Sequence, residues 1–242
     1  MVKKRLCGLV SGGKDSNYAF YRALLDGYEP VCILALRPKR SDSWMFHVPH
    51  VSLVRYQAVA MGLENVYREY EVSGVKEREV EELAEILSSL KRETGFDVVS
   101  VGAIASRYQY ERMKRISLEI GFEIYAPQWG MDPSAYMRRL VAEGFRFIIT
   151  SITVYGLPPR YLGRELAPGD VEDIIRLAGR YGFNPAFEGG EAETLVVDAP
   201  HYRKRLHVRG RPVRLGPDSW LFEIERVWLE DKGAPRRVVS GS

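Results

Sequence analysis

Short apolar runs alternate with longer amphipathic segments along the first half of the chain. The run VCILAL at residues 31–36 illustrates the pattern, because a continuous apolar stretch bounded by turn formers is typical of a strand covered on both faces. Strands that alternate with helices predict a parallel, doubly wound α/β sheet, since each crossover is right-handed and packs on one face of the sheet. The five expected strands span residues 6–10, 31–36, 66–72, 98–104 and 123–127.

Four amphipathic helices are expected to cover this sheet. Val80, Leu83, Leu87 and Leu90 recur at helical spacing, so they would form the apolar face of a long surface helix. Gly27 suits the position just after the first helix, where a left-handed backbone is common. The expected helices span residues 16–27, 51–61 and 75–93, and the fourth begins after Ser106.

The pattern changes at residues 127–130 (PQWG), which interrupt the alternation. Asp132 followed by Pro133 is typical of a helix start, and that helix would end at Gly144. We therefore expect a first domain at residues 1–126 and a second, smaller α/β or α+β domain at 127–230. The second domain would add a strand at 145–155, a helix at 170–182, strands near 195–197 and 220–229, and a flexible tail at 231–242.

Length and composition fit a globular protein of one large or two modest domains, because 242 residues with 45% hydrophobic content can bury a substantial core. No apolar stretch approaches the roughly 20 residues that a membrane span needs. The start MVKKRL lacks a signal-peptide pattern. These features predict a cytoplasmic protein without a membrane partner. A net charge of +3 is too small to indicate nucleic acid by itself.

The two cysteines, Cys7 and Cys32, both lie in apolar strand-like runs, where packing in the core is the expected role. Neither belongs to a CxxC pair. The sequence therefore argues against a disulfide framework, a cysteine metal site and a paired-thiol sulfur relay.

An anion-binding loop is predicted where the first apolar run ends, at residues 11–16 (SGGKDS). Two adjacent glycines let backbone N–H groups turn toward a phosphate, and the following helix adds its positive N-terminal end. Lys14 would supply a mobile charge, Ser11 and Ser16 hydroxyl donors, and Asp15 a carboxylate for Mg²⁺. The spacing differs from that of a Walker A loop.

The same hexapeptide resembles the pyrophosphate loop (PP-loop) of the N-type ATP pyrophosphatases. The resemblance implies cleavage of ATP between its α- and β-phosphates, with an oxygen adenylated first and AMP then displaced by nitrogen or sulfur. It also implies a sheet of the adenine nucleotide α-hydrolase-like (HUP) type. ATP and Mg²⁺ are therefore the expected cofactors, and the alternative is a Gly-Ser turn that binds nothing.

Residues just beyond the carboxyl ends of parallel strands line the ligand crevice of such a sheet. Leu36 and Arg37 end the second strand and are candidate neighbours of adenine or ribose. Small residues at the end of the fourth strand leave room for a flat ring. We therefore expect Gly102, Ala103 and Ile104 to approach the adenine, although a glycine at a strand end can also be only a turn.

Three further side chains are candidates for the same crevice. His47 lies in a long polar loop at residues 38–50, and it is either a contact to phosphate or substrate or an ordinary loop histidine. Tyr108 and Arg112 follow the fourth strand on the next helix. They would face the substrate, or they would be solvated.

Three carboxylates crowd the segment EGGEAET at residues 188–194. Like charges this close cost free energy unless a cation, a metal or hydrogen-bond donors lie among them. A cationic substrate or Mg²⁺ would fit, and the alternative is an acidic, solvated turn. The candidate substrate-binding residues of this segment are Glu188, Glu191, Glu193 and Thr194.

A basic run, RKRLHVRGRPVR at residues 203–214, contains no acidic residue. Such a run could dock an acidic protein or RNA. An exposed basic hairpin explains it equally well.

Several blocks of sequence together resemble the diphthine–ammonia ligase family, over about residues 5 to 202. They are SGGKDS, SWMFHVP, VGAIASRYQYERMKRIS, PQWG, YLGREL and EGGEAETLVVDAP. Members of this family join ammonium to the carboxyl group of diphthine, a modified histidine of translation elongation factor 2, and release AMP and pyrophosphate from ATP. One departure is Gln128, which stands where the family would be expected to have leucine.

The resemblance implies a role for each matching residue. Lys14, Asp15 and Glu191 are the expected catalytic residues, and Asp15 is the expected ligand of Mg²⁺. The carboxylates of residues 188–194 suit both the trimethylammonium group of diphthine and an incoming ammonium ion, while the residues alone do not decide which glutamate, if any, acts as general base. The residues implied at the nucleotide are Ser11, Gly12, Gly13, Lys14, Asp15, Ser16, Gly102, Ala103 and Ile104.

Two other functions stay open on the sequence. The chain could be an ATP pyrophosphatase that adenylates an RNA base or a small carboxylate; the basic run favours this, and the missing CxxC pair argues against a thiolating version. It could also be a nucleotide-binding regulatory protein without chemistry. The expected partners are elongation factor 2 and ammonium rather than nucleic acid, and the choice between monomer and homodimer is open.

Overall fold

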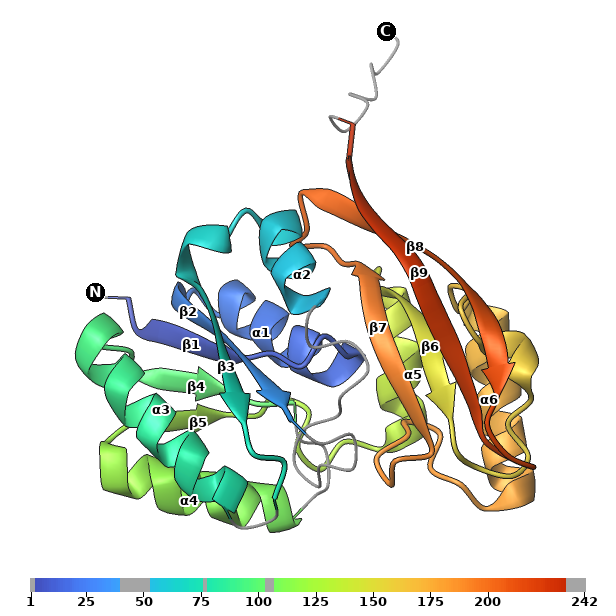
Figure 1. Ribbon diagram of the computed structural model, residues 1–242, viewed down its shortest axis with the longest axis horizontal. Coiled ribbons are helices and arrows are strands. Elements are labelled where there is room, and N and C mark those ends of the chain that lie inside the picture. The colour runs from blue at the N-terminus through green and yellow to red at the C-terminus, as the bar shows by residue number, and fades with distance from the viewer. Residues whose placement is uncertain (1–2, 40–52, 76–77, 103–106, 234–242) are drawn as a thin grey trace, which may run out of the picture.

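The computed structural model describes residues 3–39, 53–75, 78–102 and 107–233, with the backbone alone for residues 107–109. Two sheets form the framework of this part of the chain (Figure 1). No helix in the described ranges is both long and apolar enough to cross a membrane.

The first sheet has five strands in the order β3-β2-β1-β4-β5, and every pairing is parallel. This confirms the doubly wound α/β class. The order reverses at β1, so the switch point where such sheets bind ligands lies between β1 and β4. The strands are β1 (Arg5–Leu9), β2 (Glu29–Pro38), β3 (Tyr67–Val72), β4 (Val98–Ser100) and β5 (Glu123–Tyr125).

Helices cover both faces of this sheet (Figure 1). On one face Leu87 of α3 and Ile116 of α4 pack with Cys7. On the other, Phe20 of α1 and Ala58 of α2 belong to the cluster of Leu6. The elements are α1 (Lys14–Leu25), α2 (Val54–Met61), the short η2 (Glu64–Val66), α3 (Arg78–Thr94) and α4 (Arg107–Ile120).

Both cysteines pack in the core, as predicted. Cys7 on β1 lies opposite Cys32 on β2, and neither side chain is exposed. Burial raises the pKa of the Cys7 thiol well above its usual range, and the neighbouring Cys32 raises it further. A thiol buried in this way is protonated and unreactive.

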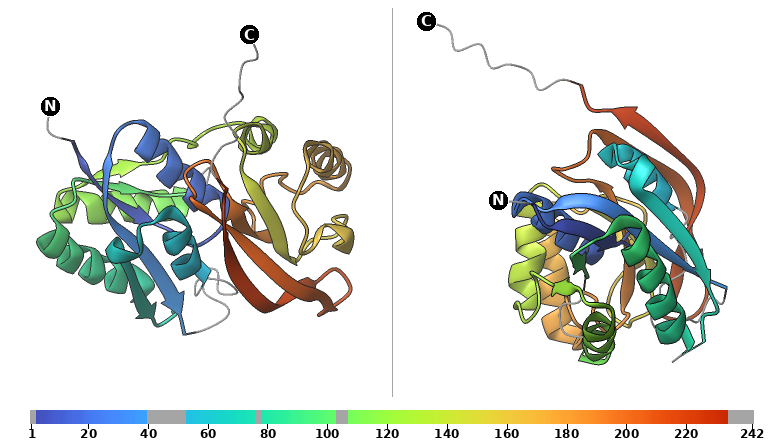
Figure 2. Two further views of the ribbon diagram at one scale, coloured as in Figure 1. Left: turned by 90° about the horizontal axis from the view of Figure 1, so that it is seen from above. Right: turned by 90° about the vertical axis from the view of Figure 1, so that its left-hand side faces the viewer.

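The second sheet is antiparallel, in the order β7-β6-β9-β8. Of the two expected classes for the second domain, this arrangement is α+β. Helices α5 and α6 pack on one face of it (Figure 2). The elements are α5 (Pro133–Ala142), β6 (Arg146–Ile152), η3 (Pro159–Tyr161), α6 (Pro168–Tyr181), β7 (Ala192–Asp198), β8 (Lys204–Arg214) and β9 (Trp220–Asp231).

The basic run forms β8, in agreement with the hairpin that the sequence offered as the alternative to a docking segment. Antiparallel pairing with β9 makes it one arm of a hairpin. Lys204 is ion-paired with Asp231 on β9, Arg205 with Glu165, and Arg211 with Glu223. Leu206 and Val208 alternate with polar residues, but the alternation breaks at Gly210, where the register with β9 shifts, so the period of two is weak in the sequence alone.

Candidate active site

The phosphate loop joins β1 to α1 at the switch point of the first sheet. Gly12 has φ +93°, a left-handed conformation that side-chain-bearing residues rarely adopt. Ser11 N donates to Ser16 Oγ at 3.1 Å, and the two serine hydroxyls lie 3.2 Å apart. The loop is thereby closed around the first turn of α1, where the backbone N–H groups favour an anion.

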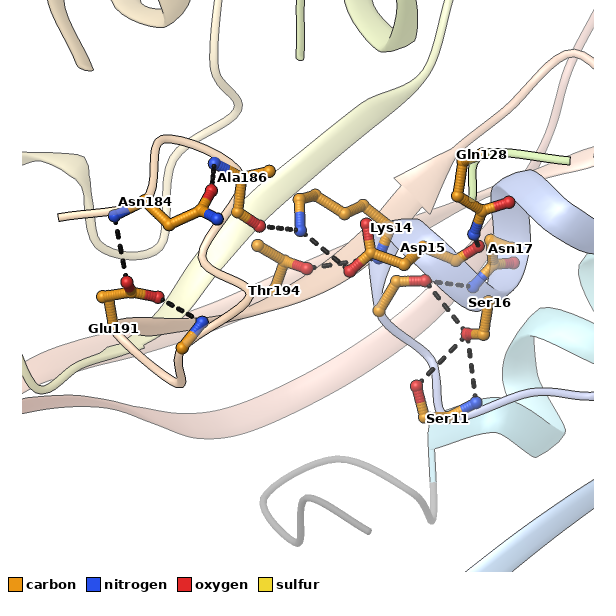
Figure 3. A network of polar contacts seen from close by, with 12 residues as sticks. Ser11, Lys14, Asp15, Ser16, Asn17, Gln128, Asn184, Ala186, Glu191 and Thr194 are labelled. Atoms are coloured by element: carbon orange, nitrogen blue, oxygen red, sulfur yellow. Dashed lines mark hydrogen bonds and ion pairs between the residues drawn. The ribbon is translucent and has the colours of Figure 1, made fainter. Parts of the chain in front are cut away.

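Lys14 is almost completely buried, with 2% of its surface exposed. Its ammonium group donates to Asp15 Oδ2 at 2.9 Å and to the carbonyl oxygen of Ala186 at 2.6 Å (Figure 3). The ring centroid of Phe187 lies 5.6 Å from the same nitrogen. The side chain from the first domain therefore ends among groups of the second.

Asp15 lies among further polar groups of the second half of the chain. Its Oδ1 is buried and has no hydrogen-bond partner among the described residues. Gln128, fully buried, donates through Nε2 to the carbonyl of Asp15 at 3.1 Å. Burial raises the pKa of Tyr136 well above its usual range, and the neighbouring Asp15 and, to a smaller extent, Glu188 raise it further. Tyr136 therefore stays protonated beside the carboxylates.

Thr194 on β7 fixes the loop from the opposite side. Its Oγ1 accepts a hydrogen bond from the backbone N–H of Lys14 at 3.2 Å. Two residues along, Val196 N donates to the carbonyl of Gly12 at 3.0 Å. The second sheet thus holds the phosphate loop by its backbone.

Glu191 was expected to be catalytic; that role stays a prediction, and the structure shows the backbone groups to which its carboxylate is bonded. Oε1 accepts from the backbone N–H of Asn184 at 3.0 Å, and Oε2 from that of Gly189 at 2.8 Å (Figure 3). Both oxygens are thus bonded inside their own loop. These two hydrogen bonds hold the segment that presents the Ala186 carbonyl to Lys14.

Gly102 lies against the phosphate loop rather than beside open space. A Cβ atom on this residue would lie 2.5 Å from Ser16 N and 2.7 Å from the carbonyl carbon of Asp15. The small residue is therefore required where β4 approaches the backbone of α1. Its proposed contact with adenine stays a prediction.

Two of the candidate nucleotide residues lie apart from the polar network of the loop. Leu36 is buried in the core on the face of α3 and α4. Arg37 forms ion pairs with Glu69 at 3.2 Å and Glu71 at 2.9 Å on β3. Both residues stand at the end of β2 as expected, but their side chains are directed to other partners.

Several sequence candidates are described only in part. His47, Ala103 and Ile104 lie outside the described residues, as does the side chain of Tyr108. Arg112 is half-buried on α4. Glu188 and Glu193 are also half-buried; Glu188 lies within the loop held by Glu191, and Glu193 lies on β7.

The sequence interpretation missed the groups that join the two domains. Gln57 is fully buried and donates from Nε2 to the carbonyls of Gly12 at 2.9 Å and Val196 at 2.8 Å. Asn17 makes two hydrogen bonds at the same junction. Its Nδ2 donates to the carbonyl of Gly13 at 3.0 Å, and its Oδ1 accepts from the Tyr202 hydroxyl at 2.8 Å. Gln57 is a polar residue on the apolar side of a helix, which is a detectable signal for such a role.

No cluster of three or more histidine, cysteine, aspartate or glutamate side chains suited to a metal ion occurs in the described part of the chain. The prediction that Asp15 holds Mg²⁺ together with ligands from a bound phosphate stays a prediction. Carboxylate-plus-phosphate coordination of this kind is usual for Mg²⁺.

Comparison with known proteins places both halves of the chain in one family. Residues 4–124 match the diphthamide synthase N-terminal domain, and residues 132–237 match the diphthamide synthase C-terminal domain. A diphthine–ammonia ligase of Danio rerio is 32% identical over 97% of this chain and 100% of its own length. The diphthine–ammonia ligase of Rattus norvegicus is 32% identical over 84% of this chain and 82% of its own length. That of Homo sapiens is 28% identical over 94% of this chain and 93% of its own length.

Proposed function

The chain belongs to the diphthamide synthase family, and from that membership we propose that it joins ammonium to the carboxyl group of diphthine on translation elongation factor 2. This ligase reaction consumes ATP and gives diphthamide, AMP and pyrophosphate, and its substrate implies a cytoplasmic enzyme. One observation carries the proposal. Lys14 and Asp15 of the phosphate loop form one polar network with Thr194 and Ala186 of the second domain, so adenylation and amide formation can share a site.

The first half-reaction activates the carboxylate. A carboxylate oxygen of diphthine attacks the α-phosphorus of ATP, the bond to the bridging oxygen of the β-phosphate breaks, and pyrophosphate leaves. Negative charge grows on the phosphates, where the ammonium of Lys14 and the N–H groups at the start of α1 stabilise it. Ser11 and Ser16 add hydroxyl donors at the same place.

Asp15 is the residue that would hold Mg²⁺ beside the phosphates. Its buried Oδ1 has no hydrogen-bond partner among the described residues, which fits a role as cation ligand. When bound, the ion would neutralise charge that develops on the transferring phosphates.

The second half-reaction forms the amide. The nitrogen attacks the acyl carbonyl and the bond to AMP breaks, so an ammonium ion loses two protons in all on its way to the amide. We assign Glu188, Glu193 and Thr194 to the acceptor side of the site, where carboxylates favour the trimethylammonium group of diphthine. Glu191 contributes through the loop that it orders.

An RNA base as the acceptor has less support. The basic run that favoured RNA in the sequence is engaged in ion pairs at Lys204, Arg205 and Arg211. These ion pairs offset positive charge that would otherwise attract a phosphate backbone.

Substitution of the loop residues tests the proposal. Lys14→Ala and Asp15→Ala should each lower pyrophosphate release at least about 100-fold, because each removes charge stabilisation from the adenylation step. The assay contains ATP, Mg²⁺, ammonium and diphthine-bearing elongation factor 2, with the mass of the factor read in parallel. Lys91→Ala, a change on α3 away from the loop, is the control for a lost lysine. Full turnover by either loop variant would refute the assigned roles.

A further inference from the structure

The ammonium group of Lys14 lies in a three-sided cage. Asp15 Oδ2 accepts from it at 2.9 Å and the Ala186 carbonyl at 2.6 Å (Figure 3). The centroid of the Phe187 ring lies 5.6 Å from the same nitrogen. We refer to these three groups as the cation cage. A carboxylate, a carbonyl and an aromatic face are the groups that bind a small ammonium ion in a site shielded from water.

The loop from the second domain is fixed so that it completes this cage. Glu191 binds the backbone at both ends of the segment, and Asn184 Oδ1 accepts from the N–H of Ala186 at 2.8 Å. Phe187 has φ +63°, a strained conformation for a bulky residue. The surrounding contacts thus hold the ring and the carbonyl in place against a conformational cost.

Lys14 cannot serve the cage and the phosphates at once. In the structure its ammonium fills the cage, whereas the phosphates of bound ATP would attract the same charge. Departure of the lysine would leave a buried carbonyl and a carboxylate oxygen without a donor, which is costly. A free ammonium ion supplies the missing charge and hydrogen-bond donors.

We propose that the cation cage is the binding site of the substrate ammonium, filled by Lys14 in the free protein and vacated when ATP draws Lys14 to its phosphates. The inference rests on the proposed function, and it adds where the ammonium binds and in which order. ATP binds before ammonium, because the nucleotide opens the cage. The bound ammonium ion then lies within the length of one lysine side chain from the phosphate loop.

A thermal measurement tests the cage without any reaction. In the Lys14→Ala variant the cage lacks its internal cation, so ammonium chloride should raise the Tm by about 3 °C at ten times the dissociation constant. Potassium chloride at the same concentration corrects for ionic strength. The wild-type chain should show no ammonium-specific rise, because Lys14 already occupies the cage.

Lys91→Ala is a matched control. Lys91 also donates to a carbonyl, that of Phe96, and its nitrogen lies 5.3 Å from the centroid of the Phe96 ring, but no ion pair to a carboxylate accompanies these contacts in the described residues. This variant should gain nothing from ammonium. Equal rises in all three proteins, or an equal rise with potassium, would overturn the assignment.

Kinetics with two nucleophiles test the cage during turnover. Phe187→Leu should raise the KM for ammonium about tenfold through loss of the cation–π contact, and leave the KM for ATP within about twofold. Hydroxylamine is largely uncharged at neutral pH, so its KM should change little. An unchanged ammonium KM, or equal losses with both nucleophiles, would overturn the cage while pyrophosphate release continued. Absence of pyrophosphate release by the wild-type chain with the factor would instead refute the proposed function.

Discussion

His201 is a titratable side chain that the proposed reaction does not use. Its ring stacks on Tyr21 with centroids 5.3 Å apart, and Phe145 and Tyr202 also contact it. Both ring nitrogens are buried without a hydrogen-bond partner among the described residues, although the residue as a whole is partly exposed. Burial lowers the pKa of His201 to about 3, and the charge of Lys232 adds to the effect.

This pKa predicts a loss of stability in mild acid. The folded state holds His201 neutral, whereas in the unfolded chain its pKa is about 6.5, so protons bind the unfolded state first as the pH falls below that value. Between pH 7.5 and pH 5, protonation of this residue in the unfolded chain should lower the free energy of unfolding by about 2 kcal/mol. The loss should continue to grow as the pH falls to 3. Denaturant unfolding at pH 7.5 and pH 5 measures the drop, which His201→Phe should remove. If the free energy of unfolding depends on pH equally in the wild-type chain and in His201→Phe, the low pKa of His201 is contradicted.

At the scale of elements, the contact between β4 and α1 decides the shape of the phosphate loop. The chain leaves β4 at Val101 and Gly102, and the backbone of Gly102 lies directly against Asp15 and Ser16. Any side chain here would push the first turn of α1 away from β4. The N–H groups that bind phosphate belong to that turn.

Gly102→Ala should therefore disrupt ATP binding as well as stability. The added methyl group meets backbone atoms that cannot rotate away, so we expect a loss of about 3 kcal/mol in the free energy of unfolding and a weaker affinity for ATP. The comparison is Gly179→Ala on α6, where a Cβ meets nothing within 4 Å and helix propensity should add about 0.5–1 kcal/mol. Thermal unfolding and ATP titration measure both. Unaltered ATP affinity in the Gly102 variant would show that the loop tolerates the shift.

At the scale of the whole molecule, one hydrophobic cluster includes residues of both sheets. Leu6 of β1 and Phe20 of α1 belong to the same buried cluster as Phe147 of β6 and Leu195 of β7. Gln57 crosses this junction by hydrogen bonding to carbonyls of both domains. The two domains should therefore unfold in a single cooperative transition.

Substitution at the junction tests this coupling. Gln57→Met leaves two buried carbonyls without its amide donor and should cost about 3 kcal/mol, whereas Tyr202→Phe removes one hydrogen bond, to Asn17, and should cost about 1 kcal/mol. Calorimetry should record one transition that shifts as a whole in both variants. Separation into two transitions would mean that the domains fold independently.

Local sequence was sufficient to predict most elements and the phosphate loop. The strands and helices of the first sheet depend on apolar spacing and on turn residues such as Gly27, which are local properties. The basic run was predicted as a hairpin only as one of two alternatives, because its pairing with β9 supplies the order that its own apolar pattern lacks. Leu36 and Arg37 were assigned to the crevice by their place at a strand end, and this assignment stays a prediction. The packing of Leu36 with α3 and α4 and the ion pair of Arg37 with β3 are tertiary contacts that the strand end alone does not specify.

The sequence by itself determined the parallel sheet, the loop at residues 11–16 and the acidic segment at 188–194, because each depends on residues that are neighbours in the chain. Only the tertiary structure decided that these two segments meet. Contacts between residues more than 170 positions apart, Lys14 with Ala186 and with Thr194, arise where β7 and the segment before it pack on the loop, and no local pattern specifies them. The same packing turned Glu191 toward its own backbone and placed the Lys14 ammonium in a cage.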